Sequence, residues 1–229
     1  MLTDTRVSQL QKLLSDLGLP EDLDLELISQ ALTHPSYLYE GCGPGEHNQR
    51  LEFLGDAVVG LVIGQYLYNK YPYKSEGELT KMRAAIVCES SLAEGAQSLN
   101  LGSYLLMGKG EGQMGGANRA SNLADSFEAL MGALYLLLGL EAVSPIILKL
   151  LGHVIAKADQ GNYGDYKTQL QELVQRKPNQ VLFYKIIREE GPDHNKIFEA
   201  GVYLNKEKIA QGKGRTKKEA EQQAAKLAL

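Results

Sequence analysis

The sequence contains no tryptophan and only two cysteines, Cys42 and Cys88, in 229 residues. These cysteines are far apart and form no CxxC pair, which argues against a disulfide framework or a zinc module and favours a reducing compartment. The longest apolar stretch without a charge, 129–140, is shorter than the roughly 20 residues of a membrane span. The opening MLTDTRVSQL lacks the basic-then-apolar layout of a secretion signal. A cytoplasmic protein with no membrane partner is therefore expected.

Positive charge is scarce in the first part of the chain and concentrated in the last part. Residues 1–160 hold 11 basic and 19 acidic side chains, whereas residues 161–229 hold 13 basic and 9 acidic ones. The overall net charge of −4 therefore conceals an acidic part and a basic part. Basic residues attract phosphates and clustered acids attract metal cations, so this asymmetry predicts two different tasks.

Helical periodicity runs through the first 157 residues, where apolar side chains recur every three or four positions. The expected helices are 7–17, 25–32, 51–71, 79–99, 123–140 and 142–156. The polar, glycine-containing residues 158–164 are expected to form a linker. In 165–229 a helix at 166–176 precedes strands at 181–188, 197–204 and 207–211 and a helix at 217–229. An all-α domain at 1–157 followed by a small α+β (α-β-β-β-α) domain at 165–229 is the predicted fold.

Two of the apolar helices carry carboxylates where a core helix normally has none. Glu52 and Asp56 are four residues apart and head a stripe that turns apolar one turn later. Asp125 and Glu128 are three residues apart and are the only charges in 123–139. Buried carboxylates are costly unless they are paired, protonated or bound to metal. If the two helices pack together, these acids predict a hard-oxygen cage for Mg²⁺, with Mn²⁺ as a possible substitute. Phosphodiester hydrolysis is the reaction that such a cage serves.

Structural explanations for the same acids remain open at this point. Asp125 would complement a helix dipole if it lay in the first turn after Ser121-Asn122, and Glu52 could pair locally with Arg50. A helical scaffold whose acids form salt bridges is then the alternative to a metal-dependent enzyme.

The basic tail carries a second signal in GKGRTKKEAEQQAAK, residues 212–226. Thr216 and Glu219 predict a capping box that starts a helix at Lys217. Lys217 and Lys218 then lie in the first turn, where they oppose the helix dipole unless an anion binds there. A solvated charge run is the structural alternative.

The other polar groups of the tail suit an A-form RNA duplex, whose minor groove exposes 2′-hydroxyls. The first helix of the module offers Thr168, Gln171 and Glu172, and a turn between strands offers His194. The strand aromatics Phe183, Tyr184, Phe198 and Tyr203 are expected to lie partly in the core, and no aromatic cluster for base stacking is predicted.

Several motifs together resemble bacterial ribonuclease III. They are ALTHPSY (31–37), HNQRLEFLGDA (47–57), EGELTKMRAAIV (76–87) and RASNLADSFEALMGALYL (119–136). The tail segments DYKTQLQE, GPDHNK and GRTKKEAEQQAA are similar to the double-stranded-RNA-binding domain of that family. The resemblance spans nearly the whole chain. It implies a homodimeric, Mg²⁺-dependent endoribonuclease that cuts both strands of duplex RNA, leaves 5′-phosphates, 3′-hydroxyls and short 3′ overhangs, and processes rRNA and mRNA.

The resemblance also implies roles for individual residues. The metal-binding and catalytic acids are Glu52, Asp56, Asp125 and Glu128. Glu76 is similar to an acid contributed across the dimer, and Phe53 is similar to an aromatic that plugs into the partner subunit. The pattern around Phe53 alone fits an internal core residue equally well.

Two positions depart from the family pattern. Gln49 stands where the family usually has Glu, so it can hydrogen-bond RNA or water but carries no charge. Gln113 stands in the glycine-rich piece 108–116 where Lys is frequent. That piece lacks GxxxxGK[ST], so no nucleotide cofactor is expected. The remaining alternative is a double-stranded-RNA-binding regulator that does not cleave.

Overall fold

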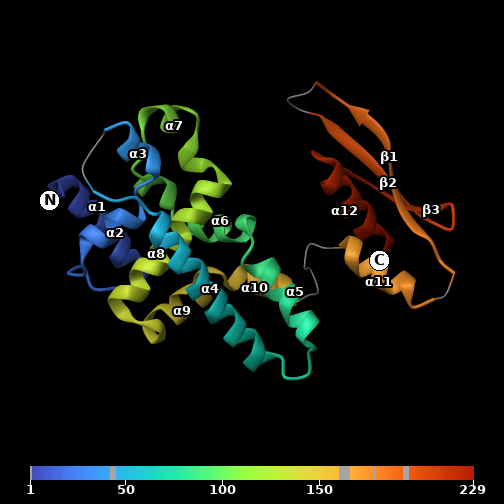
Figure 1. The fold of residues 1–229 in the computed structure, drawn as a ribbon, viewed down its shortest axis with the longest axis horizontal. Coiled ribbons are helices and arrows are strands. Elements are labelled where there is room, and N and C mark those ends of the chain that lie inside the picture. The colour runs from blue at the N-terminus through green and yellow to red at the C-terminus, as the bar shows by residue number, and fades with distance from the viewer. Residues whose placement is uncertain (1, 42–44, 160–165, 178, 193–195) are drawn as a thin grey trace. The chain divides into compact units, whose positions relative to one another are not determined.

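The computed structural model describes residues 2–41, 45–159, 166–177, 179–192 and 196–229. The chain divides into two compact units, Met1–Gly161 and Asn162–Leu229 (Figure 1). The helix that closes the first unit extends to Asp159, two residues into the predicted linker. The rest of that linker lies outside the described residues.

The first unit is helical, as predicted. Its α-helices are α1 (Asp4–Leu17), α2 (Leu25–Ala31), α3 (Pro35–Tyr39), α4 (Gln49–Lys70), α5 (Glu76–Ile86), α6 (Glu89–Ser98), α7 (Lys109–Gln113), α8 (Ala120–Leu138), α9 (Leu140–Leu150) and α10 (Gly152–Asp159). Two short 3₁₀ helices, Leu101–Tyr104 and Gly116–Asn118, flank α7. The central helix is α8, which packs against α2, α4, α6 and α9. Its apolar sequence suits this position, since Phe127, Leu130 and Leu134 are completely buried.

The predicted helix 79–99 is wrong, because the structure breaks it into α5 and α6. Cys88 adopts an extended backbone with φ −73° and ψ 155° and becomes the N-cap of α6. The hydroxyl of Ser91 donates to the carbonyl of Ala85 at 2.8 Å, so a carbonyl that loses its helical partner is satisfied by a side chain. The predicted helix 142–156 is likewise divided, into α9 and α10, at Leu151.

Helix α4 is long and apolar enough to cross a membrane by length and composition. A core helix of a globular domain passes the same test. Helix α4 packs along α8, and its residues Val59, Ile63 and Leu67 are at most 1% exposed. Its apolar character is thus partly explained by the interior of the first unit.

The second unit is an antiparallel sheet with two helices on one face, which confirms the predicted α-β-β-β-α order (Figure 1). Its elements are α11 (Tyr166–Gln175), β1 (Leu182–Glu190), β2 (Ile197–Leu204), β3 (Glu207–Gly214) and α12 (Lys217–Ala228). The strand order is β1-β2-β3, with Phe183 opposite Tyr203 and Gly201 opposite Gln211. Leu170, Val174, Val202, Ala224 and Ala225 form the core between the sheet and the helices. A Cβ at Gly212 would lie 2.3 Å from the backbone nitrogen of Ala224, so glycine lets α12 rest directly on β3.

Candidate active site and RNA interface

Two glycines allow α4 and α8 to approach each other more closely than ordinary side chains permit. A Cβ added to Gly55 would lie 1.8 Å from the carbonyl oxygen of Glu128. A Cβ added to Gly132 would lie 2.4 Å from the carbonyl oxygen of Leu51. Both glycines sit inside apolar helices, where glycine is unfavourable unless backbone contact requires it. The contact fixes the first turns of α4 beside the middle of α8.

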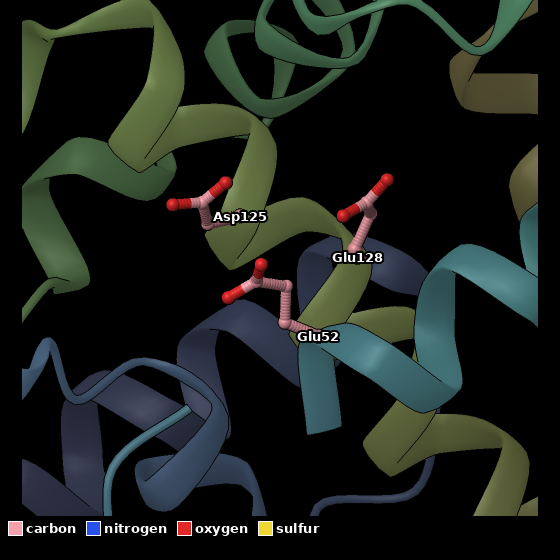
Figure 2. A group of neighbouring side chains, drawn as sticks. All are labelled: Glu52, Asp125 and Glu128. Carbon is pink, nitrogen blue, oxygen red and sulfur yellow. The ribbon is translucent and has the colours of Figure 1, made fainter. Parts of the chain in front are cut away.

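This contact brings Glu52 of α4 together with Asp125 and Glu128 of α8 (Figure 2). Each offers one carboxylate oxygen, and these oxygens all lie within 4.8 Å of one another. All three residues are partly buried. Asp56, one turn further along α4, is exposed and lies outside this group. The structure therefore joins three of the four predicted carboxylates directly and leaves the fourth at the rim.

The shared site perturbs the acids electrostatically. Burial, followed by the negative charges of Asp56, Glu52 and Asp125, raises the pKa of Glu128 to about 8. Burial raises the pKa of Glu52, and the charges of Asp125 and Asp56 raise it further. These carboxylates resist ionisation together, so the group would be stabilised by a bound positive charge.

Asp125 has neighbours of its own. Burial and then the charge of Glu89, at the start of α6, raise its pKa, and nearby His34 opposes this effect. Sequence spacing did not single out Glu89 or His34, because they come from other elements. His34 belongs to the ALTHPSY motif, and that membership was the only signal for it.

The structural explanations for the acids do not fit the observed arrangement. Helix α8 begins at Ala120, so Asp125 lies beyond the first turn, and that turn contains no acid. Among the described residues, no ion pair or hydrogen bond of Glu52, Asp125 or Glu128 is found, including the considered pairing of Glu52 with Arg50. The salt-bridge scaffold is therefore not supported at this site.

A hydrogen-bond network around Glu111 holds the start of α8 in place. Oε1 of Glu111, on α7, accepts from Nη1 of Arg119 at 2.6 Å and from Nδ2 of Asn122 at 2.8 Å. Asn122 also donates to the carbonyl of Gly116 at 3.0 Å. The glycine-rich piece thus contains an ordered helix that holds the turn preceding Asp125, a role the sequence did not reveal.

Comparisons with known proteins agree on one family. Residues 24–154 match the family described as Ribonuclease-III-like, and residues 166–229 match the double-stranded RNA binding motif. Ribonuclease 3 of Syntrophomonas wolfei is 51% identical over 229 residues, which cover 100% of this chain and 97% of that protein. The chain belongs to the ribonuclease III family. It is an endoribonuclease that cleaves double-stranded RNA.

Other members of the ribonuclease III family give the same picture. Ribonuclease 3 of Heliobacterium modesticaldum is 53% identical over 207 residues, covering 90% of this chain and 88% of that protein. A solved nuclease domain of ribonuclease III from Campylobacter jejuni, described for flexibility in a region involved in dimer formation, is 44% identical with a TM-score of 0.57. It covers 61% of this chain and 94% of its own. The first unit is accordingly a ribonuclease III nuclease domain, and the second is a double-stranded-RNA-binding domain.

Three other predicted residues of the nuclease domain lie at its surface. Phe53 is 82% exposed, so its interpretation as an internal core residue is wrong. Gln49 is the exposed first residue of α4, and Glu76 is the exposed first residue of α5. None of the three belongs to the carboxylate group described above.

The structure describes only some of the predicted contact side chains of the RNA-binding domain. Gln171 is exposed on α11. Thr168 and Glu172 lie on the same helix, but their side chains are outside the described residues, as is the whole of His194.

Lys217 and Lys218 begin α12, as predicted, but the cap differs in detail. Thr216 Oγ1 accepts the N–H of Glu219 at 3.1 Å, whereas the Glu219 carboxylate accepts the N–H of Arg215 at 2.8 Å instead of that of Thr216. Only half of the predicted capping box therefore forms. Lys217 Nζ lies 3.1 Å from Oε1 of Glu189 on β1 and 5.6 Å from the centre of the Phe198 ring. Glu189 therefore forms an ion pair with this lysine, a feature that the sequence pattern did not predict.

Proposed function

We propose that Glu52, Asp125 and Glu128 hold a catalytic Mg²⁺ ion, with Asp56 completing the set at the rim. The observation that carries this proposal is the convergence of three carboxylate oxygens within 4.8 Å, without a basic partner among the described residues. Mn²⁺ prefers the same oxygen ligands and is the expected substitute.

The donor set fits the ion. Two ligands 2.1 Å from a common Mg²⁺ lie at most about 4.2 Å apart. Neighbouring ligands at right angles lie about 3.0 Å apart, and side-chain rotations that move each oxygen by about an ångström close the observed spread of 4.8 Å to these distances. Burial and then mutual repulsion raise the pKa values of Glu52 and Glu128, and the charge of the ion would relieve the repulsion.

The residues of this chain supply position and charge for hydrolysis of a phosphodiester. The bound ion would polarise the phosphoryl oxygens and lower the pKa of a bound water. Glu52 and Glu128 fix the site between α4 and α8, and the Glu111 network holds Asp125 in register with them. Hydrolysis that releases the 3′ oxygen yields 5′-phosphate and 3′-hydroxyl ends, and staggered cuts on the two strands yield short 3′ overhangs.

A cleavage assay tests the metal assignment. Long duplex RNA is incubated with the protein and Mg²⁺, or with EDTA, and the product ends are analysed. Glu128→Gln is expected to reduce cleavage by at least about 100-fold, because it removes one charged ligand, while duplex binding in EDTA stays within about twofold. Near-normal cleavage by this variant would show that the ligand assignment is wrong, and binding without any cutting by the native chain would favour the non-cleaving regulator.

We also propose that the nuclease domain forms a two-fold dimer through the exposed face of α4. Phe53, Leu61 and Tyr68 on this face are 82%, 56% and 73% exposed. They lie nearly symmetrically about Leu61, with Phe53 about 12 Å and Tyr68 about 10 Å along the helix from it. A two-fold axis near Leu61 makes the interface self-complementary.

At the end of this α4 face that is farther from Phe53, a cavity can receive an aromatic ring. The cavity is about 500 Å³ and lies between α4 and α5, lined by Gly64, Leu67, Tyr68, Glu76, Leu79 and Arg83 among others. The two-fold axis places Phe53 of the partner subunit over this cavity. Glu76 lines this cavity, and Glu52 directly precedes Phe53 in the chain. The same two-fold arrangement therefore brings Glu76 near the carboxylate group of the partner subunit, which supports a cross-dimer role for Glu76.

Sedimentation equilibrium at micromolar concentration tests the dimer. The native chain is expected to have twice the monomer mass, and Phe53→Ala is expected to dissociate at least tenfold more readily, because a buried aromatic anchor carries much of such an interface. A monomeric native chain would contradict the proposal.

The RNA-binding domain is proposed to hold duplex RNA through α11, through His194 in the segment between β1 and β2, which lies outside the described residues, and through Lys217 and Lys218. The exposed side of α11 supplies Gln171, and Thr168 and Glu172 belong to the same proposed contact. Processing of rRNA and mRNA precursors in the cytoplasm is the proposed cellular role, with Gln49 as an uncharged hydrogen-bonding group near the cut site.

A further inference from the structure

The RNA-binding domain has a second sheet surface that its helices do not cover. We call it the outer sheet face and define it by the residues that alternate away from the core: Phe183, Lys185, Ile187, Glu199, Gly201, Tyr203, Lys208, Gln211 and Lys213. The strand register places these side chains on one side. The opposite side contributes Tyr184 and Val202 to the core against the helices (Figure 1).

An aromatic pair occupies one end of this face. The rings of Phe183 and Tyr203 stack with centroids 5.0 Å apart and an interplanar angle of 6°. The pair spans β1 and β2, and β1 is an edge strand, so the stack ends at Phe183 on the border of the sheet. Phe183 is 39% exposed, so the expectation that the strand aromatics lie partly in the core is wrong for this residue, whereas Tyr184 packs against the core. One ring surface is therefore available to continue the stack.

Gly201 leaves the sheet surface beside this aromatic pair without a side chain. A Cβ at Gly201 would lie 2.8 Å from Cδ1 of Ile187 and 3.0 Å from Cε2 of Tyr203. A side chain at this position would displace the end of the Ile187 side chain, so glycine lets Ile187 and Tyr203 lie close to the strand backbone. The result is an apolar floor of Ile187 and the two rings toward one end of the face, with Ile187 45% exposed.

Positive charge surrounds this floor. Lys185 pairs with Gly201 across β1–β2, Lys208 pairs with Tyr203 across β2–β3, and Lys213 pairs with Glu199. Lys208 donates to Oε1 of Gln211 at 2.7 Å, which holds both polar groups above β3. Arg188 also lies on this side but forms an ion pair with Glu190. Three lysines against one acid, Glu199, leave the outer sheet face net positive.

We propose that the outer sheet face binds unpaired RNA, with a base stacked on Phe183 and the backbone phosphates beside Lys185 and Lys208. Aromatic rings next to cations form the chemistry by which proteins hold single-stranded nucleic acid, since every base has a π-face and every nucleotide a phosphate. A protein partner fits less well, because lysine is depleted at protein–protein interfaces. The face therefore captures single-stranded flanks of a duplex that the helical side of the domain recognises.

Binding of tailed and blunt duplexes to the full chain tests this proposal. The probes are one fluorescent RNA duplex with blunt ends and the same duplex with a single-stranded 3′ tail of about 10 nucleotides. Anisotropy is measured in EDTA, so that cleavage and the metal proposal do not enter. The native chain is expected to bind the tailed RNA about tenfold more tightly, as one stacked base allows.

The double variant Phe183→Val, Tyr203→Val removes the rings but keeps residues that favour strands. It is expected to lose the preference for the tail and to bind blunt duplex as the native chain does. Tyr73→Val, which removes a 99% exposed tyrosine of the nuclease domain, is the matched control and is expected to keep the preference. Thermal unfolding and circular dichroism establish that the double variant is folded.

Crosslinking locates the tail independently. A 4-thiouridine in the tail is expected to crosslink to the strand peptides that contain Phe183 or Tyr203. The proposal is overturned if the native chain shows no preference for the tail, if the folded double variant retains it, or if crosslinks map only to the nuclease domain. The double variant could also change the mass measured by sedimentation while leaving binding of the tail unchanged. That result would identify a face that binds protein and would equally refute the proposal.

Discussion

Glu128→Gln is expected to stabilise the nuclease domain at alkaline pH when no divalent cation is present. The folded protein raises the pKa of Glu128 from 4.5 to about 8, mainly through burial. When the pH is below the pKa of this carboxyl in the unfolded chain, the carboxyl is protonated in both states and does not destabilise the fold. The penalty grows as the pH rises from 4.5 and is complete above about 8. Glutamine has nearly the same shape and no charge, so it avoids the penalty.

The size of the effect follows from the shift after allowance for solvent. Each pKa unit corresponds to about 1.4 kcal/mol. Because the carboxyl is partly exposed and is screened by water, we expect roughly 2 kcal/mol instead of the full value. For a domain of this size that gain raises Tm by about 4–8 °C. The difference should be smaller at pH 5.5, because Glu128 is then protonated in the folded state.

Thermal unfolding in EDTA at pH 5.5 and pH 8.5 measures this directly, and a second series with Mn²⁺ adds the metal. Mn²⁺ is expected to stabilise the native chain and to stabilise Glu128→Gln much less. Glu141→Gln, at an exposed position in the first turn of α9, is the control and should give no gain. A variant that is no more stable than the native chain at pH 8.5, or one that keeps the full Mn²⁺ effect, would refute the electrostatic account of the site.

The remaining predictions concern the helix contact and the RNA interface. Gly55→Ala places a methyl group 1.8 Å from the carbonyl oxygen of Glu128 and must move the helices apart. We expect at least about 100-fold slower cleavage with duplex binding retained, whereas Gly152→Ala, which meets nothing within 4 Å, should cleave normally. Replacing Lys217 and Lys218 by Ala should reduce the slope of log affinity against log salt by about 2, and an unchanged slope would exclude their phosphate contacts. Glu189→Gln should tighten duplex binding up to about fivefold at low salt, because Lys217 loses its competing carboxylate, and weaker binding would contradict this.

Local patterns in the sequence located most of the elements, although not the break between α5 and α6 or that between α9 and α10, and they placed each pair of acids on one helix. The alternation of apolar residues located β2 at 197–204, and the Thr216 signal located the start of α12 at Lys217. The three-residue spacing of Asp125 and Glu128 placed both on one face of α8. These properties depend on residues adjacent along the chain, so a helical or strand period reveals them directly. The resemblance to ribonuclease III supplied the function.

Only the tertiary structure decided how separate elements meet. Gly55 and Gly132 permit the backbone contact that joins Glu52 to Asp125 and Glu128, and the same contact leaves Asp56 at the rim. Glu189 reaches Lys217, and Phe183 stacks on Tyr203, through strand and helix packing that no local period encodes. The period of a helix or strand determines which face of that element a residue occupies. Which other element packs against that face depends on the shapes of side chains that are distant in sequence and on their close packing.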